Sequence, residues 1–407
     1  MTLNVFKNTV LLFVFIMISS ACKSNASSEN NNSTIDTNTS NPEIIVGANR
    51  TTTYLPLLKS KKVGIVANQT SVIFKTDNSY THLVDSLASL SVNIKTVFAP
   101  EHGFRGQADA GEHIKDGIDS KTGIPIVSLY GNNKKPKPEQ LKELDIVVFD
   151  IQDVGARFYT YISTLHYVME ACAEQQIPLL ILDRPNPNGH YIDGPVLEKA
   201  HESFVGMHPV PIVHGMTIAE YAQMINGQGW LKNNVRCDVQ LITMLNYNRD
   251  MFYHIPIKPS PNLPNDQAIN LYPSLCFFES TNVNAGRGTD KQFQIYGSPY
   301  LKNQNFEYTP KPNAGAKHPK YEGKLCYGQD LSATEKQSAI NLSYLINAYK
   351  NTSKKEEFFN SFFTKLAGTE QLQQQILAGM DANAIKATWQ KDLDAFKLTR
   401  KKYLLYN

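Results

Sequence analysis

The sequence predicts an α/β protein, in which a parallel sheet is followed by a smaller α+β domain. Short apolar runs alternate with amphipathic stretches between about residues 60 and 183, as strands and helices do when they alternate. Most of these runs are apolar on both faces, which is typical of a parallel sheet covered by helices on each side. From about residue 265 Pro, Tyr and Gly become frequent, which indicates a second domain.

The expected elements follow one another in chain order. Strands are expected at 63–67, 93–99, 124–129, 145–150 and 178–183, and helices at 81–90, 138–144 and 163–175. In the last helix Leu165, Val168 and Cys172 share one face at helical spacing. Thr217 and Glu220 have the pattern of a capping box, which predicts a helix over 218–225. Two amphipathic helices are expected in the second domain, at 332–349 and 372–396.

The first 42 residues read as a targeting segment and a tether. Lys7 and the apolar run 10–18, too short to span a bilayer as a helix, predict a signal peptide over residues 1–21. Small residues precede Cys22 as in a lipobox, so we expect Cys22 to be lipidated; the alternative is an ordinary cleaved signal with an incidental Cys. Fourteen of the twenty residues 23–42 are Asn, Ser or Thr, which predicts a flexible tether.

These features predict an exported, membrane-anchored lipoprotein of the periplasm. Its body is expected to comprise a sheet domain over 43–265 and an auxiliary domain over 266–407. The formal net charge is +3 and no long basic run occurs, so no nucleic-acid partner is expected. Neither GxGxxG nor GxxxxGK[ST] follows the first strand, and the Cys spacing matches no metal pattern. We therefore expect no cofactor and no metal, and we expect Cys172, Cys237, Cys276 and Cys326 to be buried thiols, although a disulfide remains open.

Polar side chains follow each of the five expected strands. They are Asn68 with Gln69, Glu101 with His102, Tyr130 with Gly131, Asp150 with Asp153, and Asp183 with Arg184. In open α/β sheets the ligand crevice lies outside the carboxyl ends of the strands. The sequence therefore predicts a site at this edge of the sheet.

The loop 100–106 carries the strongest candidate for proton transfer. It places Glu101, His102 and Arg105 close together between a strand and Gly106. Partial desolvation at the end of a strand would raise the pKa of Glu101 toward the range of a general acid. The alternative is structural, with Glu101 capping a helix or pairing with Arg105.

The stretch 150–161 is the second candidate. It contains Asp150, Asp153, Arg157 and Tyr159, and carboxylates, guanidinium groups and aromatic rings together suit a sugar ligand. The alternative is an Asp–Arg ion pair that orders the loop.

Three further segments contribute candidates. Asp183 lies in a Pro-rich turn and could orient another side chain or cap a helix. His214 precedes the capping box, which does not explain it. Glycines flank Arg287, which indicates tight turns that present a guanidinium suited to a carboxylate. Glu279 could be a second catalytic carboxylate or could neutralise Arg287.

Five of these segments resemble the exo-β-N-acetylmuramidase (NamZ-type) family. They are 100–106, 150–161, 183–189, 214–217 and 279–289, and they occur in the matching order from about residue 45 to the C-terminus. The resemblance implies a Rossmann-like domain, a smaller C-terminal domain and an active site between them. It also implies release of N-acetylmuramic acid from non-reducing ends of peptidoglycan fragments, and it carries the role of catalytic Glu to Glu101. Ser280, where the family often has Gly, and His190 depart from the pattern.

The resemblance and the residues together lead to one main hypothesis. Glu101 is the acid of a glycoside hydrolase, and Asp153 or Glu279 is the second carboxylate. The lactyl carboxylate of muramic acid requires an Arg, for which Arg105, Arg157 and Arg287 are candidates. The expected sugar contacts also include Asn68, His102, Asp150, Tyr159, Asp183 and His214. The expected partners are MurNAc–GlcNAc, muropeptides and, through the lipid anchor, a membrane.

Two alternatives belong to other classes of protein. A metal-dependent hydrolase could use His102, His113, Asp150, Asp153 and His214, although their spacing matches no standard zinc pattern. A non-catalytic lipoprotein that binds muropeptides could use the same edge of the sheet. An acid beside an imidazole, as in Glu101–His102, favours catalysis over binding alone.

Overall fold

The computed structural model describes residues 43–106, 116–302 and 304–407. Glu43–Asn407 forms one compact unit. The predicted signal peptide, Cys22, the tether and His113 lie outside the described residues. Within the described residues no helix is long and apolar enough to cross a membrane.

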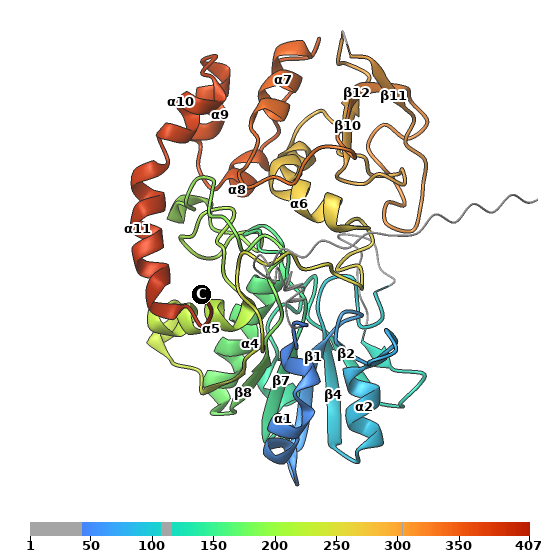
Figure 1. Ribbon diagram of the computed structural model, residues 1–407, viewed down its shortest axis with the longest axis vertical. Coiled ribbons are helices and arrows are strands. Elements are labelled where there is room, and N and C mark those ends of the chain that lie inside the picture. Colours follow the sequence, from blue (N-terminus) through green and yellow to red (C-terminus); the bar gives the residue numbers. More distant parts are fainter. Residues whose placement is uncertain (1–42, 107–115, 303) are drawn as a thin grey trace, which may run out of the picture. The chain divides into compact units, whose positions relative to one another are not determined.

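Among the described residues a seven-stranded sheet has the order β5-β6-β4-β1-β7-β8-β9. Figure 1 shows its strands β8, β7, β1 and β4. Its strands are β1 (Lys62–Ala67), β4 (Asn93–Ala99), β5 (Gly117–Ile118), β6 (Pro125–Ser128), β7 (Ile146–Asp150), β8 (Leu179–Leu182) and β9 (Val239–Ile242). All neighbours pair in parallel except β5 and β6. The six parallel strands therefore have the Rossmann order 3-2-1-4-5-6, with the switch point between β1 and β7. The predicted α/β fold is confirmed.

Helices cover both faces of this sheet because its strands are apolar on both sides. In β7, Ile146 and Val148 pack on the face of α1 (Thr51–Leu58) and α2 (Leu83–Ser89). The alternate residues Val147 and Phe149 belong to the cluster of α3 (Pro138–Leu141), α4 (Tyr161–Gln175) and α5 (Ile218–Gly227). This alternation is the period of two expected of a strand.

The remaining elements complete the chain. A hairpin of β2 (Val72–Phe74) and β3 (Tyr80–His82) lies between β1 and α2. The C-terminal part holds an antiparallel sheet of β10 (Ile295–Ser298), β12 (Cys326–Asp330) and β11 (Phe306–Tyr308). Its helices are α6 (Asp266–Leu275), α7 (Ser343–Asn351), α8 (Phe363–Ala367), α9 (Gln371–Leu377), α10 (Ala382–Ala387) and α11 (Gln390–Arg400). Short 3₁₀ turns are η1 (Gly47–Asn49), η2 (Lys199–His201), η3 (Lys232–Asn234), η4 (Cys276–Ser280) and η5 (Lys401–Tyr403).

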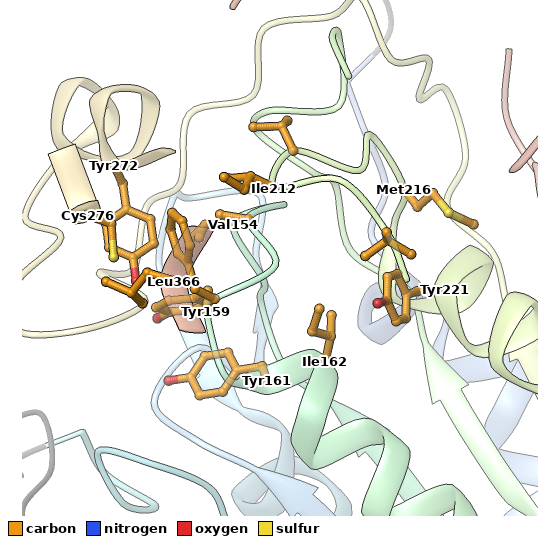
Figure 2. Packing of buried hydrophobic residues seen from close by; sticks show 14 of the residues in the cluster. Val154, Tyr159, Tyr161, Ile162, Ile212, Met216, Tyr221, Tyr272, Cys276 and Leu366 are labelled. Atoms are coloured by element: carbon orange, nitrogen blue, oxygen red, sulfur yellow. The ribbon is translucent and has the colours of Figure 1, made fainter. Parts of the chain in front are cut away.

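The two parts share one hydrophobic core. A single cluster runs from Phe149 in the main sheet to Phe396 in α11. Figure 2 shows Tyr159 of the first part close to Tyr272 and Leu366 of the second. The chain end returns to α5 (Figure 1), where Glu220 accepts a hydrogen bond from the Leu405 amide at 2.8 Å. Continuous packing of this kind makes the two parts one folded unit.

Two helix predictions in the C-terminal part were wrong in their bounds. The helix expected at 332–349 begins only at Ser343, because the preceding backbone bonds elsewhere: the Ile340 amide donates to Asp193 at 2.8 Å. The helix expected at 372–396 is broken into α9, α10 and α11. Gly379 has a φ of +79° and ends one helix, and Asp381 caps the next.

Candidate active site

A tight turn presents Glu101 at the carboxyl end of β4. The Gly103 amide donates to the Pro100 carbonyl at 3.0 Å, and His102 has a φ of +70° at the third position of the turn. That position ordinarily favours Gly or Asn, so His102 is held in a strained conformation. Such strain is common where a fold fixes functional side chains. Because the turn begins at Pro100, Glu101 lies in the turn and does not continue strand β4.

Two hydroxyl groups lie against the Glu101 carboxylate. Thr160, directly before α4, donates from Oγ1 to Oε2 of Glu101 at 2.7 Å. Tyr130, just after β6, also bonds to Glu101: burial raises the pKa of its hydroxyl, and the charge and hydrogen bond of Glu101 raise it further. Residues after two further strands, β6 and β7, therefore fix this carboxylate.

Glu101 borders a cavity of about 150 Å³ between the two parts of the unit. The main-sheet part contributes His102, Tyr159 and Thr160. The C-terminal part contributes Tyr272, Cys276, Glu279 and Arg287. Figure 2 shows Tyr159, Tyr272, Cys276 and Leu366 gathered at this place. Because both parts line the cavity, a ligand held there would be enclosed by both.

Glu279 and Arg287 form the wall of the cavity opposite the main sheet. Arg287 Nε lies 2.9 Å from Glu279 Oε1, and its guanidinium lies 5.3 Å from the centre of the Phe293 ring. Gly286 and Gly288 have φ values of +78° and +80°, which is the tight turn the sequence predicted. Burial acts to lower the pKa of Arg287, but the charge and hydrogen bond of Glu279 outweigh it, so the pKa is raised and the cation is retained.

Tyr159 and Asn68 help to hold the loop that begins at Pro259, Tyr159 directly and Asn68 through Tyr161. The Tyr159 hydroxyl donates to the Pro259 carbonyl at 2.8 Å, and so does that of Tyr161 at 3.0 Å. Asn68 Nδ2 donates to Tyr161 at 2.9 Å. Pro259 begins the segment whose residues Ser260, Asn262 and Leu263 line the cavity. Asn68 is thus a positioning residue, whereas Tyr159 also lines the cavity.

Asp150 and Asp183 are buried in structural contacts. Asp150 forms an ion pair with Arg184, at 2.5 Å and 2.9 Å, within the sheet. Asp183 accepts from Thr217 Oγ1 at 2.8 Å and from the Ala219 amide at 3.0 Å, at the start of α5. The capping box of Thr217 is confirmed. Both carboxylates lie at strand ends as predicted, and neither is part of the cavity lining, so the sugar contacts expected of them stay a prediction.

The two other arginines do not line the cavity. Arg157 is fully buried and donates to four backbone carbonyls, among them Val210 at 2.8 Å and Ala367 at 2.8 Å. Arg105 pairs with Asp85 at 3.1 Å and with Asp119 at 2.8 Å. Within the described residues Arg287 is the arginine that the cavity lining includes.

Asp153 and His214 are buried beside the core. Asp153 Oδ2 accepts from the Gly155 amide at 2.7 Å, and burial raises the pKa of this carboxyl to about 7. His214 Nδ1 accepts from the Met216 amide at 3.2 Å, and burial, followed by the charges of Arg400 and Arg157, lowers its pKa to about 3. Neither side chain is part of the cavity lining, whereas that of Glu279 is.

The described residues bring together no group of three or more His, Cys, Asp or Glu side chains that could hold a metal ion. Cys172, Cys237, Cys276 and Cys326 are free and buried, as expected of packed thiols. Cys276 lies in the cavity wall, where burial raises the pKa of its thiol. These thiols are therefore protonated and act as packing groups.

Sequence reasoning missed several lining residues. Thr160, Ser260, Asn262, Tyr272 and Phe293 were not singled out, although they complete the cavity. The Pro- and Asn-rich run 259–265 was the available signal for the first loop, because such turns commonly present polar groups. Tyr272 and Phe293 gave no signal of their own, because buried aromatic residues read as core.

The main sheet has the Rossmann strand order, and the cavity beside it is lined by two carboxylates, Glu101 and Glu279. The chain belongs to the exo-β-N-acetylmuramidase NamZ family of glycoside hydrolases: the family's N-terminal model matches residues 63–267, and its C-terminal model matches residues 270–406. The family resemblance stated from the five motifs is confirmed.

Known relatives cover most of the chain. It is 38% identical over 374 residues to the peptidoglycan β-N-acetylmuramidase NamZ of Bacillus subtilis (strain 168), covering 87% of this chain and 89% of that protein. A DUF1343 family protein of Bacteroides fragilis NCTC 9343 has a crystal structure with a TM-score of 0.83 and 47% identity, covering 90% of this chain and 99% of that one. A second such protein from the same organism has a TM-score of 0.75 and 26% identity, covering 89% and 99%.

Proposed function

We propose that this protein is an exo-acting glycoside hydrolase that releases N-acetylmuramic acid from the non-reducing ends of peptidoglycan fragments. Membership of the NamZ family and the name of the Bacillus subtilis relative support this substrate. The observation that carries the proposal is the position of Glu101 at a strand end, in a cavity that both parts of the unit line and that also holds Glu279. A small cavity of this kind suits an enzyme that takes one terminal sugar.

In the proposed mechanism Glu101 protonates the oxygen of the scissile glycosidic bond. The hydroxyls of Thr160 and Tyr130 hold the carboxyl group in place for that transfer. A general acid of this kind contributes about 10²–10⁴-fold to the rate. Glu279 then stabilises the oxocarbenium-like transition state, as nucleophile or as base for water.

Arg287 is proposed to bind the lactyl carboxylate of muramic acid. Glu279 engages its Nε, and the guanidinium carries further donors in a planar fork that matches a carboxylate. Its place in the cavity lining supports this role over Arg105 and Arg157, whose contacts lie elsewhere.

Mutation distinguishes the two candidates for the second carboxylate, Glu279 and Asp153, by the effect of each substitution on kcat. Glu279→Gln is expected to reduce kcat by about 10²-fold or more, because the amide can neither attack nor stabilise positive charge. Asp153→Asn is expected to change kcat by less than about threefold, since Asp153 lies outside the cavity lining. The reverse ranking would make Asp153 the second acid.

The exo mode is tested with the tetrasaccharide MurNAc-GlcNAc-MurNAc-GlcNAc. We expect free MurNAc and the trisaccharide as first products, separated by chromatography with mass detection. The matched control is a chain that begins with GlcNAc, which the enzyme is expected to leave intact. Early release of disaccharides, or cleavage of the control chain, would contradict the proposed function.

We also propose that the enzyme is exported and anchored through Cys22. The apolar run before Cys22 and the Asn-, Ser- and Thr-rich stretch after it support an anchor followed by a tether. In the native host, Cys22→Ala is expected to move the protein from the membrane fraction to the soluble fraction with its activity intact. An unchanged membrane fraction would contradict lipidation at this position.

A further inference from the structure

A group of partly exposed aromatic rings lies beside Glu101. It consists of Tyr130 after β6, Tyr167 in α4 and Phe204 in the segment after η2, and we call it the aromatic platform. The Tyr167 and Phe204 rings are nearly parallel, at 17° with centroids 6.3 Å apart, and Tyr130 lies 6.2 Å from Phe204. Lys134 Nζ lies 4.6 Å from the centre of the Phe204 ring.

The aromatic platform adjoins the cavity at Glu101. Tyr130 bonds to the Glu101 carboxylate, so one member of the platform touches the acid. Val205 and Thr160 line the cavity, and Ser163, one turn along α4 from Thr160, donates to the Phe204 carbonyl at 2.7 Å. Tyr130, Tyr167 and Phe204 themselves are not part of the cavity lining.

Core packing does not account for these rings. The aromatic side chains that build the core, such as Phe149, Phe277 and Phe278, are fully buried. Those of the platform are half-buried, and they converge from three separate segments at one side of the catalytic carboxylate. Aromatic faces stack on the C–H faces of sugar rings, while a Lys amine beside them can donate to hydroxyl groups.

We propose that the aromatic platform binds the leaving sugar, the N-acetylglucosamine residue next to the scissile bond. This inference rests on the proposed function, in which the cavity holds muramic acid. The acid of a glycosidase must reach the oxygen that joins the two sugars. Glu101 lines the cavity and bonds to Tyr130, so a leaving sugar that extends from the cavity past this carboxyl group would reach Tyr130 and Phe204.

The test compares two substrates that share the muramic acid but differ in the leaving group. MurNAc-GlcNAc offers a ring to the platform, and methyl β-N-acetylmuramide offers none. Phe204→Ala is expected to lower kcat/KM for the disaccharide about 10-fold, equivalent to about 1.4 kcal/mol, and to leave the methyl glycoside within about twofold. Phe204→Leu keeps the apolar bulk without the aromatic face and is expected to have the same effect.

Phe252→Ala is the matched control. Lys336 Nζ lies 5.4 Å from the Phe252 ring, so the pair resembles Lys134 and Phe204, but Phe252 lines a different hollow, with Pro187 and Asn188. This variant is expected to act on both substrates like the unmodified enzyme. Equal losses on both substrates in Phe204→Ala, or no loss on either, would overturn the proposal.

A second hollow, lined by Glu279, Arg287 and His318, provides the competing place for the leaving sugar. His318→Ala is expected to leave kcat/KM for the disaccharide unchanged. If His318→Ala lowered kcat/KM for the disaccharide alone, and Phe204→Ala did not, the proposal for the aromatic platform would be overturned. If the unmodified enzyme releases no MurNAc from either substrate, the proposed function fails. Calorimetric titration with GlcNAc then decides the platform: binding that Phe204→Ala abolishes supports it, and absent or unaffected binding overturns it.

Discussion

At the residue scale, Asp153 links a single side chain to the pH dependence of stability. It is 6% exposed, and among the described residues its Oδ1 has no hydrogen-bond partner. Burial raises the pKa of this carboxyl from the ordinary 3.8 to about 7. The folded state therefore holds the proton more tightly than the unfolded state, so the stability from Asp153 is complete below about pH 4 and is lost as pH rises through 7.

Asp153→Asn is expected to remove this pH dependence. The neutral amide avoids the cost of a buried charge. The free energy of unfolding of the variant, relative to that of the unmodified protein, should therefore rise by up to a few kcal/mol from pH 5 to pH 8. Urea unfolding of both proteins at pH 5 and at pH 8 measures this rise. Asp183, whose pKa burial also raises to about 7, is present in both proteins and cancels in the comparison. Parallel pH profiles for the two proteins would contradict the expectation.

Other residue predictions depended on partners distant in sequence. Glu101 could be placed at the sheet edge because it lies two residues after the apolar strand β4, and the cavity lining includes it. Asp150 and Asp183 could be placed at strand ends but not in their contacts, because Arg184 and Tyr406 come from other parts of the chain. The sequence indicates which side chains lie at the same edge of the sheet. The tertiary packing determines which of them form ion pairs or cap helices.

At the element scale, Arg157 joins the loop after β7 to the end of α8. Two of its four acceptors are the carbonyls of Leu366 and Ala367, at 3.0 Å and 2.8 Å. These are among the last carbonyls of that helix, which have no partner within it. A guanidinium donates to them from inside the core, and thereby ties the C-terminal part to the main sheet.

Arg157→Met is expected to destabilise the protein by about 3–5 kcal/mol, because four buried carbonyls lose their donor. Arg105→Met is the matched control: its guanidinium is 31% exposed, and its ion pairs with Asp85 and Asp119 are worth at most about 1 kcal/mol each. Chemical denaturation of both variants measures the difference. Equal losses in the two variants would contradict the structural role of Arg157.

The strands of the main sheet were predictable, and the C-terminal elements were less so. Parallel strands buried on both faces give unbroken apolar runs, and the five expected runs correspond to β1, β4, β6, β7 and β8. The edge strand β9 has three half-buried residues among its four, so it gave a weaker signal. The break between α9 and α10 at Gly379 and Asp381 carried a usable signal, a glycine end followed by a cap.

At the scale of the whole molecule, the shared core predicts cooperative unfolding. One hydrophobic cluster includes residues of the main sheet and of the C-terminal helices, and the Tyr406 hydroxyl near the chain end donates to Asp183 at 2.7 Å. We expect a single calorimetric transition for residues 43–407, with equal calorimetric and van't Hoff enthalpies. Two separated transitions would show that the parts fold independently.

The candidate active site is also built from both parts. Glu101 belongs to the main sheet, whereas Glu279 and Arg287 belong to the C-terminal part, and both sides line one cavity. Any change that separates the parts should therefore impair binding and catalysis together, whereas changes at Glu101 alone should affect catalysis. This difference singles out Glu101 as the residue on which the proposed mechanism depends most.

The most direct test is the hydrolysis of 4-nitrophenyl β-N-acetylmuramide by the unmodified enzyme and by Glu101→Gln. The β-N-acetylglucosaminide serves as substrate control, and Glu174→Gln, at a surface ion pair with Lys135, serves as control variant. We expect cleavage of the muramide alone, reduced about 10²–10⁴-fold in Glu101→Gln and unchanged in Glu174→Gln. Near-normal turnover by a folded Glu101→Gln enzyme would contradict the proposed role of Glu101.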